Sequence, residues 1–370
     1  MKITGAVLEE IGRQRPFADS RPISISELEL DGPGPTEILI RLEAAGICHS
    51  DLSVVDGNRV RPVPMLLGHE AAGRVVEVGS AVTDLQPGQR VVMSFLPRCE
   101  ECGNCAADGR LPCTAGSKSN NEGTLLHGSV HLGRGGEKVH HHLGVSGFAT
   151  HAVVDRASAV PVGDDIPADI AAVLGCAVLT GGGAVLNAAR PGPEDSVMIV
   201  GLGGVGMAAL ITAISQGVSR IVAVDTLEEK LEHARRLGAH EAFTPQQVLE
   251  DGIKARYVIE CAGNPRAFET AFAATAVGGT TITAGLPSPE ARASISPLTV
   301  TAEARTIVGS YLGSAVPSRD IPKYAQLWRE GKLPVEELIS KRISLAEINE
   351  AMDQLADGKA VRQVIMFDAE

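Results

Sequence analysis

One stretch limits the possible folds more than any other, because three glycines at a fixed spacing join a predicted strand to a predicted helix. The apolar run DSVMIV is followed directly by GLGGVG, where Gly201, Gly203 and Gly206 form the pattern G-x-G-x-x-G, and then by the helical pattern MAALITAISQG. Glycines in this context allow a tight turn, close approach of the backbone to a phosphate, and packing of the helix on the strand. The stretch predicts the first strand and helix of a parallel sheet.

Strands and helices continue to alternate after this stretch. The segments RIVAVD, ARYVIECAG and TTITAGLP have the apolar character of buried strands, and helical patterns lie between them. Such alternation is typical of α/β folds with a doubly wound parallel sheet. We predict that residues 178–311 form this domain.

The glycine-rich turn also predicts a dinucleotide site. The helix that begins near Gly204 and Val205 offers free backbone N–H groups to a pyrophosphate. Asp225 ends the next predicted strand, where a carboxylate accepts hydrogen bonds from ribose hydroxyls and repels a 2′-phosphate. This favours NAD over NADP as cofactor. The alternative is a structural glycine turn in which Asp225 only caps a helix.

The first half of the chain has a different character. Segments such as TEILIRLEAAGI, AAGRVVEVGS and QRVVMSF are strand-like and are separated by turn signals such as DGPGP and LQPGQ. We predict a β-rich domain or barrel over residues 1–177, in which residues 114–147, rich in Gly, Ser and His, form a long irregular segment. Residues 312–370 are expected to be a helix-rich tail that ends on the strand QVIMF and returns to the first domain.

Composition limits the partners. The net charge of −12 argues against nucleic acid or an anionic membrane surface, since Lys and Arg are scattered and form no basic stripe. We expect no apolar run long enough to span a bilayer and no leader-like apolar stretch at the N-terminus. These features predict a cytoplasmic protein of about two domains with a small-molecule substrate.

Four of the seven cysteines lie close together in a polar stretch, at Cys99, Cys102, Cys105 and Cys113. In a reducing compartment, clustered cysteines are more often metal ligands than disulfides. Four thiolates on a short lobe, about residues 97–115, match a closed tetrahedral zinc site that orders a loop with little core. A four-thiolate iron centre is the alternative, because spacing alone does not separate the two metals.

Three other residues are candidates for a second, catalytic zinc, which usually has three protein ligands and an open position. They are Cys48 in GICHSD, His69 in MLLGHEAAG and Cys176 in VLGCAVL. Taken singly, each is more typical of a core cysteine or a satisfied histidine. Taken together beside a dinucleotide fold, they indicate a zinc ion held at the nicotinamide.

These segments give the chain a resemblance over essentially its whole length. The motifs GICHSD, GHEAAGRVVEVG, the four-cysteine lobe, LGC and GLGGVG are similar to those of the zinc-containing medium-chain alcohol dehydrogenases, in their longer, liver-like form. The resemblance implies a GroES-like β-domain split around a central Rossmann domain, two zinc ions per chain, NAD, and a homodimer. It makes Cys48, His69 and Cys176 the ligands of the catalytic zinc.

The same resemblance implies roles for further residues. Asp51 and Glu70 would surround the catalytic zinc ligands, with Asp51 orienting His69, and Ser50 would take the alcohol proton. The remaining implied contacts are His49 and Arg362 at the pyrophosphate, Asp225 and Lys230 at the adenosine ribose, and Phe95 in the substrate pocket.

Three positions depart from the family pattern. Ser53 stands where many liver-like members have a histidine at the end of the proton path, Arg59 stands where a pocket-edge residue is often apolar, and Leu96 replaces a smaller polar residue. A serine hydroxyl cannot act as a base near neutral pH. We therefore expect protons to leave this site through hydroxyl groups alone.

The expected reaction is the reversible oxidation of an alcohol to an aldehyde or ketone, by hydride transfer to NAD. Two alternatives stay open: a thiol-dependent formaldehyde dehydrogenase in which Arg59 contacts a carboxylate of the thiol, and a zinc-stabilised nucleotide-binding protein without catalysis. The tract His140–His142 resembles a metal-binding tract but is interpreted as a loop near the pocket rim, and Cys261 as a core residue.

Overall fold

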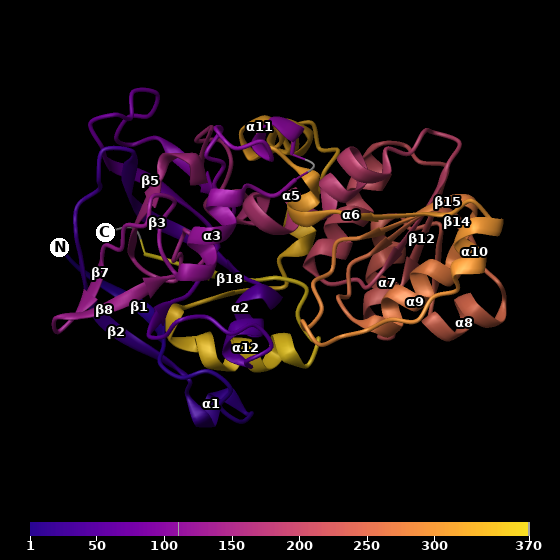
Figure 1. Ribbon diagram of the computed structural model, residues 1–370, viewed down its shortest axis with the longest axis horizontal. Helices are drawn as coiled ribbons and strands as arrows, with labels where there is room; N and C mark the ends of the chain where they lie inside the picture. The colour runs from indigo at the N-terminus through magenta and orange to yellow at the C-terminus, as the bar shows by residue number, and fades with distance from the viewer. Residues whose placement is uncertain (110, 369–370) are drawn as a thin grey trace. The chain divides into compact units, whose positions relative to one another are not determined.

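The computed structural model describes residues 1–109 and 111–368, which fold into two compact units (Figure 1). The first unit contains Met1–Cys176, Val316–Ala325 and the chain from Ile339 onward; the second contains Ala177–Ala315 and Gln326–Leu338. The C-terminal segment is therefore divided, since Gln326–Leu338 packs with the second unit and its neighbours on both sides with the first.

A small closed barrel forms one part of the first unit. Its strands follow the order β1, β2, β7, β8 and β4, with bounds Lys2–Leu8, Ile23–Leu30, Leu132–Arg134, Glu137–His141 and Met65–Leu66. In β2, Leu28 and Leu30 are buried while Glu27 and Glu29 between and beside them are exposed. This period of two is what a strand with one face on a core requires.

A seven-stranded sheet forms the rest of the first unit. Its order is β10 (Ala159–Val162), β6 (Arg90–Met93), β5 (Glu70–Val78), β3 (Glu37–Ile47), β18 (Gln363–Met366) and β17 (Lys341–Ile343), and β9 (His151–Asp155) also pairs with β3. Antiparallel pairing of β18 with β3 sets Gln363 opposite Ile47. The start of β18 is thereby held next to Cys48, which follows β3 directly.

Residues 114–147 are not the irregular segment that their composition predicts. They contain α3 (Thr114–Glu122) as well as β7 and β8. Gly116 lies so close to the chain that an added Cβ would be 2.4 Å from the Pro97 carbonyl oxygen, and Asn120 Nδ2 donates a hydrogen bond to the Phe95 carbonyl at 2.7 Å. Residues that are poor helix formers in isolation are thus held in a helix by tertiary contacts.

The second unit holds the predicted doubly wound sheet. Six parallel strands follow the order β13 (Glu241–Phe243), β12 (Arg220–Val224), β11 (Ser196–Val200), β14 (Ala255–Glu260), β15 (Thr275–Thr283) and β16 (Thr306–Gly309). The chain moves outward in one direction from β11 and in the other from β14. This reversal is the switch point at which such sheets bind ligands.

Helices connect these strands and cover the sheet (Figure 1). The connecting helices are α6 (Gly204–Ser215), α7 (Glu228–Leu237), α8 (Pro245–Glu250), α9 (Pro265–Ala274) and α10 (Pro297–Ala302). The other described helices are α1 (Phe17–Ser20), α2 (His49–Val55), α4 (Ala168–Val173), α5 (Leu179–Gly183), α11 (Pro317–Arg329) and α12 (Ile348–Ala356).

The expectation that no apolar run is long enough to span a membrane is wrong. The continuous helical stretch Ala168–Ala189 has 22 residues and a mean hydropathy of 1.8, which meets the length and composition of a spanning helix. However, 94% of its apolar window is buried inside the protein. A stretch that is apolar on all sides and covered by protein is typical of a core helix.

Candidate active site and zinc centres

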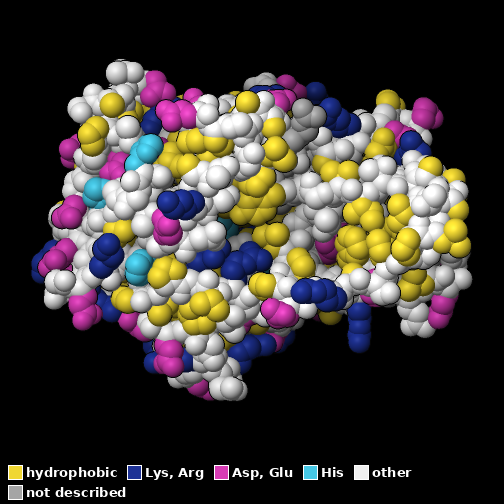
Figure 2. Space-filling view, in the orientation of Figure 1, with side chains coloured by type: hydrophobic (Ala, Val, Ile, Leu, Met, Phe, Trp, Pro, Cys, Tyr) yellow, Lys and Arg dark blue, Asp and Glu magenta, His cyan; other side chains and the backbone are white. Residues whose placement is uncertain are grey.

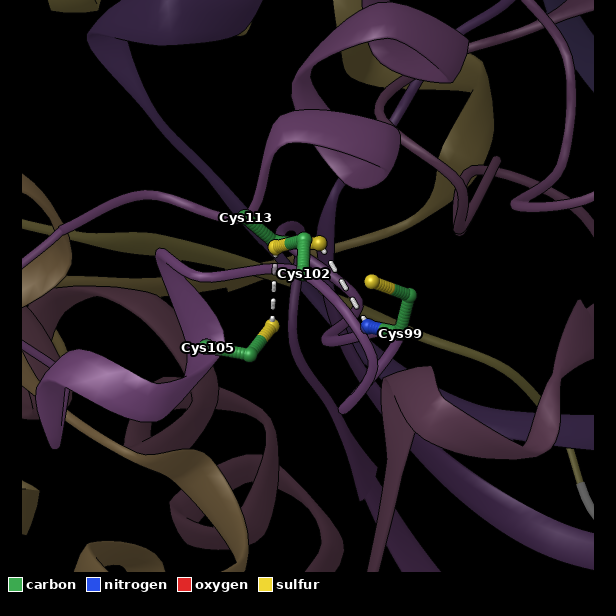
Figure 3. Close-up of side chains that lie close together, drawn as sticks. All are labelled: Cys99, Cys102, Cys105 and Cys113. Carbon is green, nitrogen blue, oxygen red and sulfur yellow. Dashed lines mark hydrogen bonds between the residues drawn. The ribbon is translucent and has the colours of Figure 1, made fainter.

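The four clustered cysteines lie on one lobe of the first unit and turn toward one another (Figure 3). All four are free thiols, and the sulfur atoms of Cys99, Cys102, Cys105 and Cys113 lie within 4.8 Å of one another. Cys113 is buried and begins α3, whereas the other three are partly exposed. The lobe thus brings together the four donors that the sequence predicts.

Backbone N–H groups point at these sulfur atoms. The N–H groups of Cys99 and Gly116 each donate to Cys113 Sγ at 3.4 Å. A backbone hydrogen bond at Thr114 is the largest of the effects that lower the pKa of Cys102 to about 6. Such donors favour the thiolate, which is the form that binds metal ions. The lobe therefore fits the closed zinc site proposed for it.

A second set of donors converges elsewhere in the same unit. Cys48 begins α2, His69 lies between β4 and β5, and Cys176 lies in a π-helical turn, Leu174–Val178. Their ligand atoms all lie within 4.8 Å of one another, with Cys176 Sγ 3.4 Å from His69 Nε2. All three side chains are buried. Three residues far apart in the sequence thus form one cluster.

Close backbone packing sets the position of Cys176. A Cβ on the preceding Gly175 would lie 2.1 Å from the carbonyl oxygen of Met93, at the end of β6, so a larger residue does not fit there. The π-helical turn adds one residue to the helix at this point, a distortion frequent at functional sites. Together these features direct the Cys176 sulfur toward His69.

The donor set is chemically suited to zinc. A hydrogen bond from Cys176 lowers the pKa of the Cys48 thiol, and the same contact raises the pKa of Cys176. Two thiols this close oppose each other's ionisation unless a cation lies between them. Two cysteines and one histidine are also a known ligand set of catalytic zinc in alcohol dehydrogenase, with a fourth position left open. The cluster therefore fits the predicted catalytic zinc.

Asp51 links two of these donors. Its Oδ1 lies 2.9 Å from His69 Nδ1, and its Oδ2 accepts a hydrogen bond from the Cys48 backbone N–H at 3.0 Å. Burial alone would raise the pKa of Asp51, but the neighbouring histidines lower it to about 2. An ionised carboxylate only accepts hydrogen bonds, so His69 carries its proton on Nδ1 and leaves Nε2 for a metal.

Glu70 and Arg362 form a buried pair beside Cys48. Arg362 Nη1 donates to the Ile47 carbonyl at 2.8 Å, and its Nε lies 3.4 Å from Glu70 Oε1. Burial raises the pKa of Glu70 to about 7, against the effect of Arg362. The resemblance assigns Arg362 to the cofactor, and the structure places its guanidinium within the surroundings of the cysteine–histidine cluster, with 3% of the residue exposed.

The other candidates of the opening motif lie on α2. His49 is exposed and Ser50 is half-buried in its first turn. Ser53 Oγ donates a hydrogen bond to the His49 carbonyl at 2.6 Å, and the N–H of Arg59 donates to the Ser53 carbonyl at 2.7 Å. The Ser53 hydroxyl thus already donates its hydrogen bond to the backbone of α2.

One of the two expected pocket residues lies at the proposed histidine ligand. Phe95 is buried, and its ring meets the His69 ring edge-on with 5.6 Å between centroids. Leu96 beside it is buried as well. An aromatic side chain therefore lies next to the donor cluster.

In the second unit, each glycine of the motif has a separate structural reason. Gly201 has a φ of +92°, and a Cβ on Gly206 would lie 1.8 Å from the Gly201 carbonyl oxygen. A Cβ on Gly203 would meet nothing within 4 Å. Gly203 therefore leaves open space where α6 begins, as approach of a phosphate to the helix N-terminus requires.

Asp225 also contributes to this loop. Its Oδ2 accepts a hydrogen bond from the Leu202 N–H at 2.7 Å, and its Oδ1 accepts one from the Leu227 N–H at 3.1 Å. A carboxylate has about four acceptor positions, so ribose hydroxyls can still be bound. Lys230 lies half-buried on α7. Capping and cofactor binding are compatible roles for Asp225.

One residue of the site was missed by sequence reasoning. His142 is buried, and its Nδ1 lies 3.2 Å from Asp51 Oδ1. The interpretation of His140–His142 as a rim loop is wrong, because His140 and His141 belong to β8 and His142 follows them into the interior. Three consecutive histidines in the sequence indicate that one of them could contact the site, but only the fold shows that His142 lies against Asp51.

A β-rich unit with two cysteine-based donor sets and a doubly wound unit with a dinucleotide-type turn define a class, the metal-dependent dehydrogenases with a nucleotide domain. Comparison with known proteins makes this specific. Residues 34–164 match the family described as the alcohol dehydrogenase GroES-like domain, and residues 204–330 match the zinc-binding dehydrogenase family.

Similar proteins cover the whole chain. An NDMA-dependent alcohol dehydrogenase of Amycolatopsis methanolica is 35% identical, with 100% of both chains covered, and a geraniol dehydrogenase of Castellaniella defragrans is 36% identical, with 98% and 97% covered. The crystal structure of benzyl alcohol dehydrogenase from Acinetobacter calcoaceticus is 29% identical, covers 100% of both chains and has a TM-score of 0.90. The chain belongs to the zinc-containing medium-chain alcohol dehydrogenase family, whose members are oxidoreductases acting on alcohols.

Proposed function

We propose that the protein is a zinc-dependent alcohol dehydrogenase that passes hydride reversibly from an alcohol to NAD. The observation that carries this proposal is the buried cluster of Cys48, His69 and Cys176, whose ligand atoms lie within 4.8 Å of one another. These three residues would hold the catalytic zinc, and the four-cysteine lobe would hold a second, structural one. When bound at the cluster, zinc supplies Lewis acidity that lowers the pKa of an alcohol.

The chain's own residues have separate tasks in this reaction. Asp51 fixes the His69 ring through the 2.9 Å contact at Nδ1. Ser50, two residues after Cys48 and half-buried, is the proposed acceptor of the alcohol proton. Phe95 and Leu96 offer apolar surface to the carbon part of an alcohol. Alcohols with an apolar or aromatic group are therefore the proposed substrates.

The proposed cofactor site rests on the second unit. The open space at Gly203 and the first turn of α6 support binding of a pyrophosphate. The Asp225 carboxylate supports binding of an unphosphorylated ribose, and hence NAD over NADP. His49, exposed at the start of α2, and Arg362 remain the proposed pyrophosphate contacts from the first unit.

A substrate panel tests the proposal. The purified holoenzyme is given geraniol, benzyl alcohol, ethanol and a secondary alcohol with NAD or NADP, and NADH absorbance is recorded. Because one relative is named for its dependence on NDMA, parallel reactions contain NDMA without added NAD. Formaldehyde with and without glutathione or mycothiol forms a further arm.

Each outcome separates two hypotheses. Oxidation of the apolar alcohols with free NAD supports the proposal as stated, whereas turnover only with NDMA would keep the alcohol chemistry and remove NAD as a freely exchanging cofactor. Formaldehyde oxidation that needs the thiol would favour the alternative in which Arg59 binds that thiol. No turnover with any alcohol, in protein that contains zinc, would favour a nucleotide-binding protein without catalysis.

We also propose that the protein forms a homodimer in the cytoplasm. Strand β16 ends the sheet order, and Ile307 on it and Leu298 on α10 are 38% and 75% exposed. Figure 2 shows hydrophobic side chains grouped on the visible face of the second unit. A second copy pairing along β16 would cover such an edge. Analytical ultracentrifugation of wild type and Ile307→Lys tests this, and a monomeric wild type would contradict it.

The proposed cytoplasmic location is supported by the cysteines. Seven free cysteines fit a reducing compartment.

A further inference from the structure

Two imidazole rings meet one oxygen atom of Asp51. His69 Nδ1 lies 2.9 Å from Asp51 Oδ1, and His142 Nδ1 lies 3.2 Å from the same atom. The second contact has the length of a hydrogen bond but not its geometry, so it is a close polar contact between His142 and the carboxylate. All three side chains are at most 1% exposed. The carboxylate that orients the proposed zinc ligand therefore also faces the ring nitrogen of His142.

His142 also touches the zinc ligand directly. The rings of His69 and His142 pack edge to face, with 5.5 Å between centroids and 87° between planes. Phe95 packs on His69 in the same manner, at 5.6 Å and 84°. The His69 ring is thus fixed by Asp51 at Nδ1 and by two further rings at its sides.

An ordinary core residue does not explain a histidine at this position. The Nε2 atom of His142 is buried without a hydrogen-bond partner among the described residues. A buried polar group without a partner is unfavourable. A phenylalanine could supply the same ring packing without that penalty. What phenylalanine cannot supply is an N–H group facing the Asp51 carboxylate.

We propose that His142 is a positioning residue for the catalytic zinc, which holds the Asp51 carboxylate and the His69 ring in the orientation that the metal requires. The inference rests on the proposed function, because it needs zinc at Cys48, His69 and Cys176. Loss of a residue that orients a ligand typically weakens metal binding about 10- to 100-fold. Since the contact is longer than that of His69, we expect about a tenfold effect.

The test compares zinc release from the holoenzymes of wild type, His142→Phe and His142→Asn. Asparagine carries an N–H donor near the position of Nδ1, whereas phenylalanine keeps the ring and has no donor. His140→Phe is the matched control, since His140 is half-buried on β8 in the same tract and has no contact with Asp51 among those described. Zinc per chain is counted first, and release to a chromogenic chelator is then followed.

We expect His142→Phe to release one of its two zinc ions about tenfold faster, while the four-cysteine zinc keeps its wild-type rate as an internal control. The thermal midpoint should stay near that of wild type, because the ring still fills the space. Cobalt placed at the catalytic site should give an altered visible spectrum in His142→Phe, and His142→Asn should lie closer to wild type. His142→Leu gives the same comparison if the phenylalanine variant does not fold.

Wild-type release rates and an unchanged cobalt spectrum in His142→Phe would overturn the inference and leave the proposed function intact. Zinc release that is equally accelerated in His140→Phe would also overturn the inference. The effect would then come from a general disturbance of β8 and not from the contact of His142 with Asp51. A wild-type protein with fewer than two zinc ions would instead contradict the proposed function itself.

Discussion

Cys48 and Asp51 close the first turn of α2 from both sides. The Cys48 backbone N–H donates to Asp51 Oδ2 at 3.0 Å, and the Asp51 backbone N–H donates to the Cys48 carbonyl at 3.0 Å. The same Asp51 carboxylate lies 2.9 Å from His69 Nδ1. One carboxylate therefore connects the start of the helix, the first proposed zinc ligand and the second.

Replacing this carboxylate should release the catalytic zinc selectively. Asp51→Asn keeps the size of the side chain but removes the charge and one acceptor, so that the Cys48 N–H and His69 compete for a single oxygen. We expect zinc affinity at the cluster to fall about 10- to 100-fold. Metal analysis after dialysis should give one zinc ion per chain, against two in wild type.

Asp56→Asn is the matched control, since Asp56 lies at the other end of α2, is exposed, and its carboxylate accepts hydrogen bonds only from Asn58 among the described residues. It should keep both zinc ions. Two zinc ions in dialysed Asp51→Asn would show that Asp51 does not orient His69.

The four-cysteine lobe should be needed for folding of its surroundings and not for chemistry. Cys105→Ser removes one of four sulfur ligands, and the lobe has few buried apolar side chains of its own. We expect loss of one zinc ion and rapid proteolysis near residues 97–115. Cys261→Ser, outside both clusters, should keep two zinc ions and resist proteolysis like wild type. Equal protease resistance in Cys105→Ser and wild type would contradict the structural role.

Two substitutions of Asp225 separate its two roles. Asp225→Asn keeps an acceptor for the Leu202 N–H but removes the charge, whereas Asp225→Ala removes both. If the charge repels a 2′-phosphate, both variants should narrow the preference for NAD over NADP in kcat/KM, and the alanine variant should also melt at a lower temperature. A wild type that uses both cofactors equally would contradict the role of Asp225 in selection.

A buried ion pair away from the zinc cluster predicts a pH-dependent stability. His131 Nε2 lies 2.6 Å from Glu37 Oε2. The hydrogen bond to Glu37 raises the pKa of His131 against the effect of burial. Burial alone would raise the pKa of Glu37, but His131 and Ser129 lower it to about 2.

The two pKa shifts determine how the pair's contribution to stability depends on pH. A histidine with a raised pKa stabilises the fold fully below its unfolded pKa of about 6.5, and this contribution is lost as pH rises through the folded value. Glu37 contributes above its unfolded pKa of about 4.3 and loses that contribution as pH falls toward 2. The pair therefore contributes most between about pH 4.5 and 6.5.

Urea unfolding of wild type and His131→Gln at pH 6 and pH 9 tests this. The difference in unfolding free energy should be largest at pH 6 and smaller at pH 9, and zinc loss affects both proteins alike. His127→Gln, at an exposed histidine 3.6 Å from Asp155, should differ little from wild type at either pH. A difference for His131→Gln that is independent of pH would exclude the ion pair as its cause.

The parts of the site that could be predicted from residue patterns are those whose partners are close in sequence. The four cysteines fall on one lobe, and the glycines span a single strand–helix turn, so spacing alone indicates their chemistry. The three proposed ligands of the catalytic zinc lie on separate elements, at Cys48, His69 and Cys176. Taken singly, each is more typical of a core cysteine or a satisfied histidine. The predicted dinucleotide fold beside them indicates a common zinc ion, and the family resemblance makes all three its ligands.

What the sequence did not predict depended on tertiary packing. The helix α3 forms from Gly, Ser and Asn because Gly116 packs against the Pro97 carbonyl. The stretch Ala168–Ala189 has the length and hydropathy of a spanning helix, and only the fold shows that protein covers it. The contact of His142 with Asp51 has no local signal, since it depends on how β8 runs into the interior.

The Ser53 hydroxyl provides the last prediction. It donates to the His49 carbonyl at 2.6 Å, four residues back along α2, so its proton is already used within the helix. Ser53→Ala should therefore change kcat little, whereas Ser50→Ala should be far more damaging because Ser50 is the proposed acceptor of the alcohol proton. A Ser53→Ala enzyme as impaired as Ser50→Ala would show that Ser53 is an essential relay.

Ser53→His should add to this site a side chain that accepts protons near neutral pH. An imidazole with a pKa of about 6.5 can accept a proton near neutral pH, which a serine hydroxyl cannot. General-base assistance is typically worth roughly 10²- to 10⁴-fold, and a base remote from the reacting atom should give less, roughly tenfold. We expect faster alcohol oxidation at pH 7, a smaller gain at pH 9 where hydroxide is plentiful, and one additional ionisation in the profile of kcat against pH. A deuterated alcohol must first show that hydride transfer limits kcat, because a slow release step would hide the change. An unchanged profile in Ser53→His, with that isotope effect present, would mean that the proton leaves by a route that does not pass position 53.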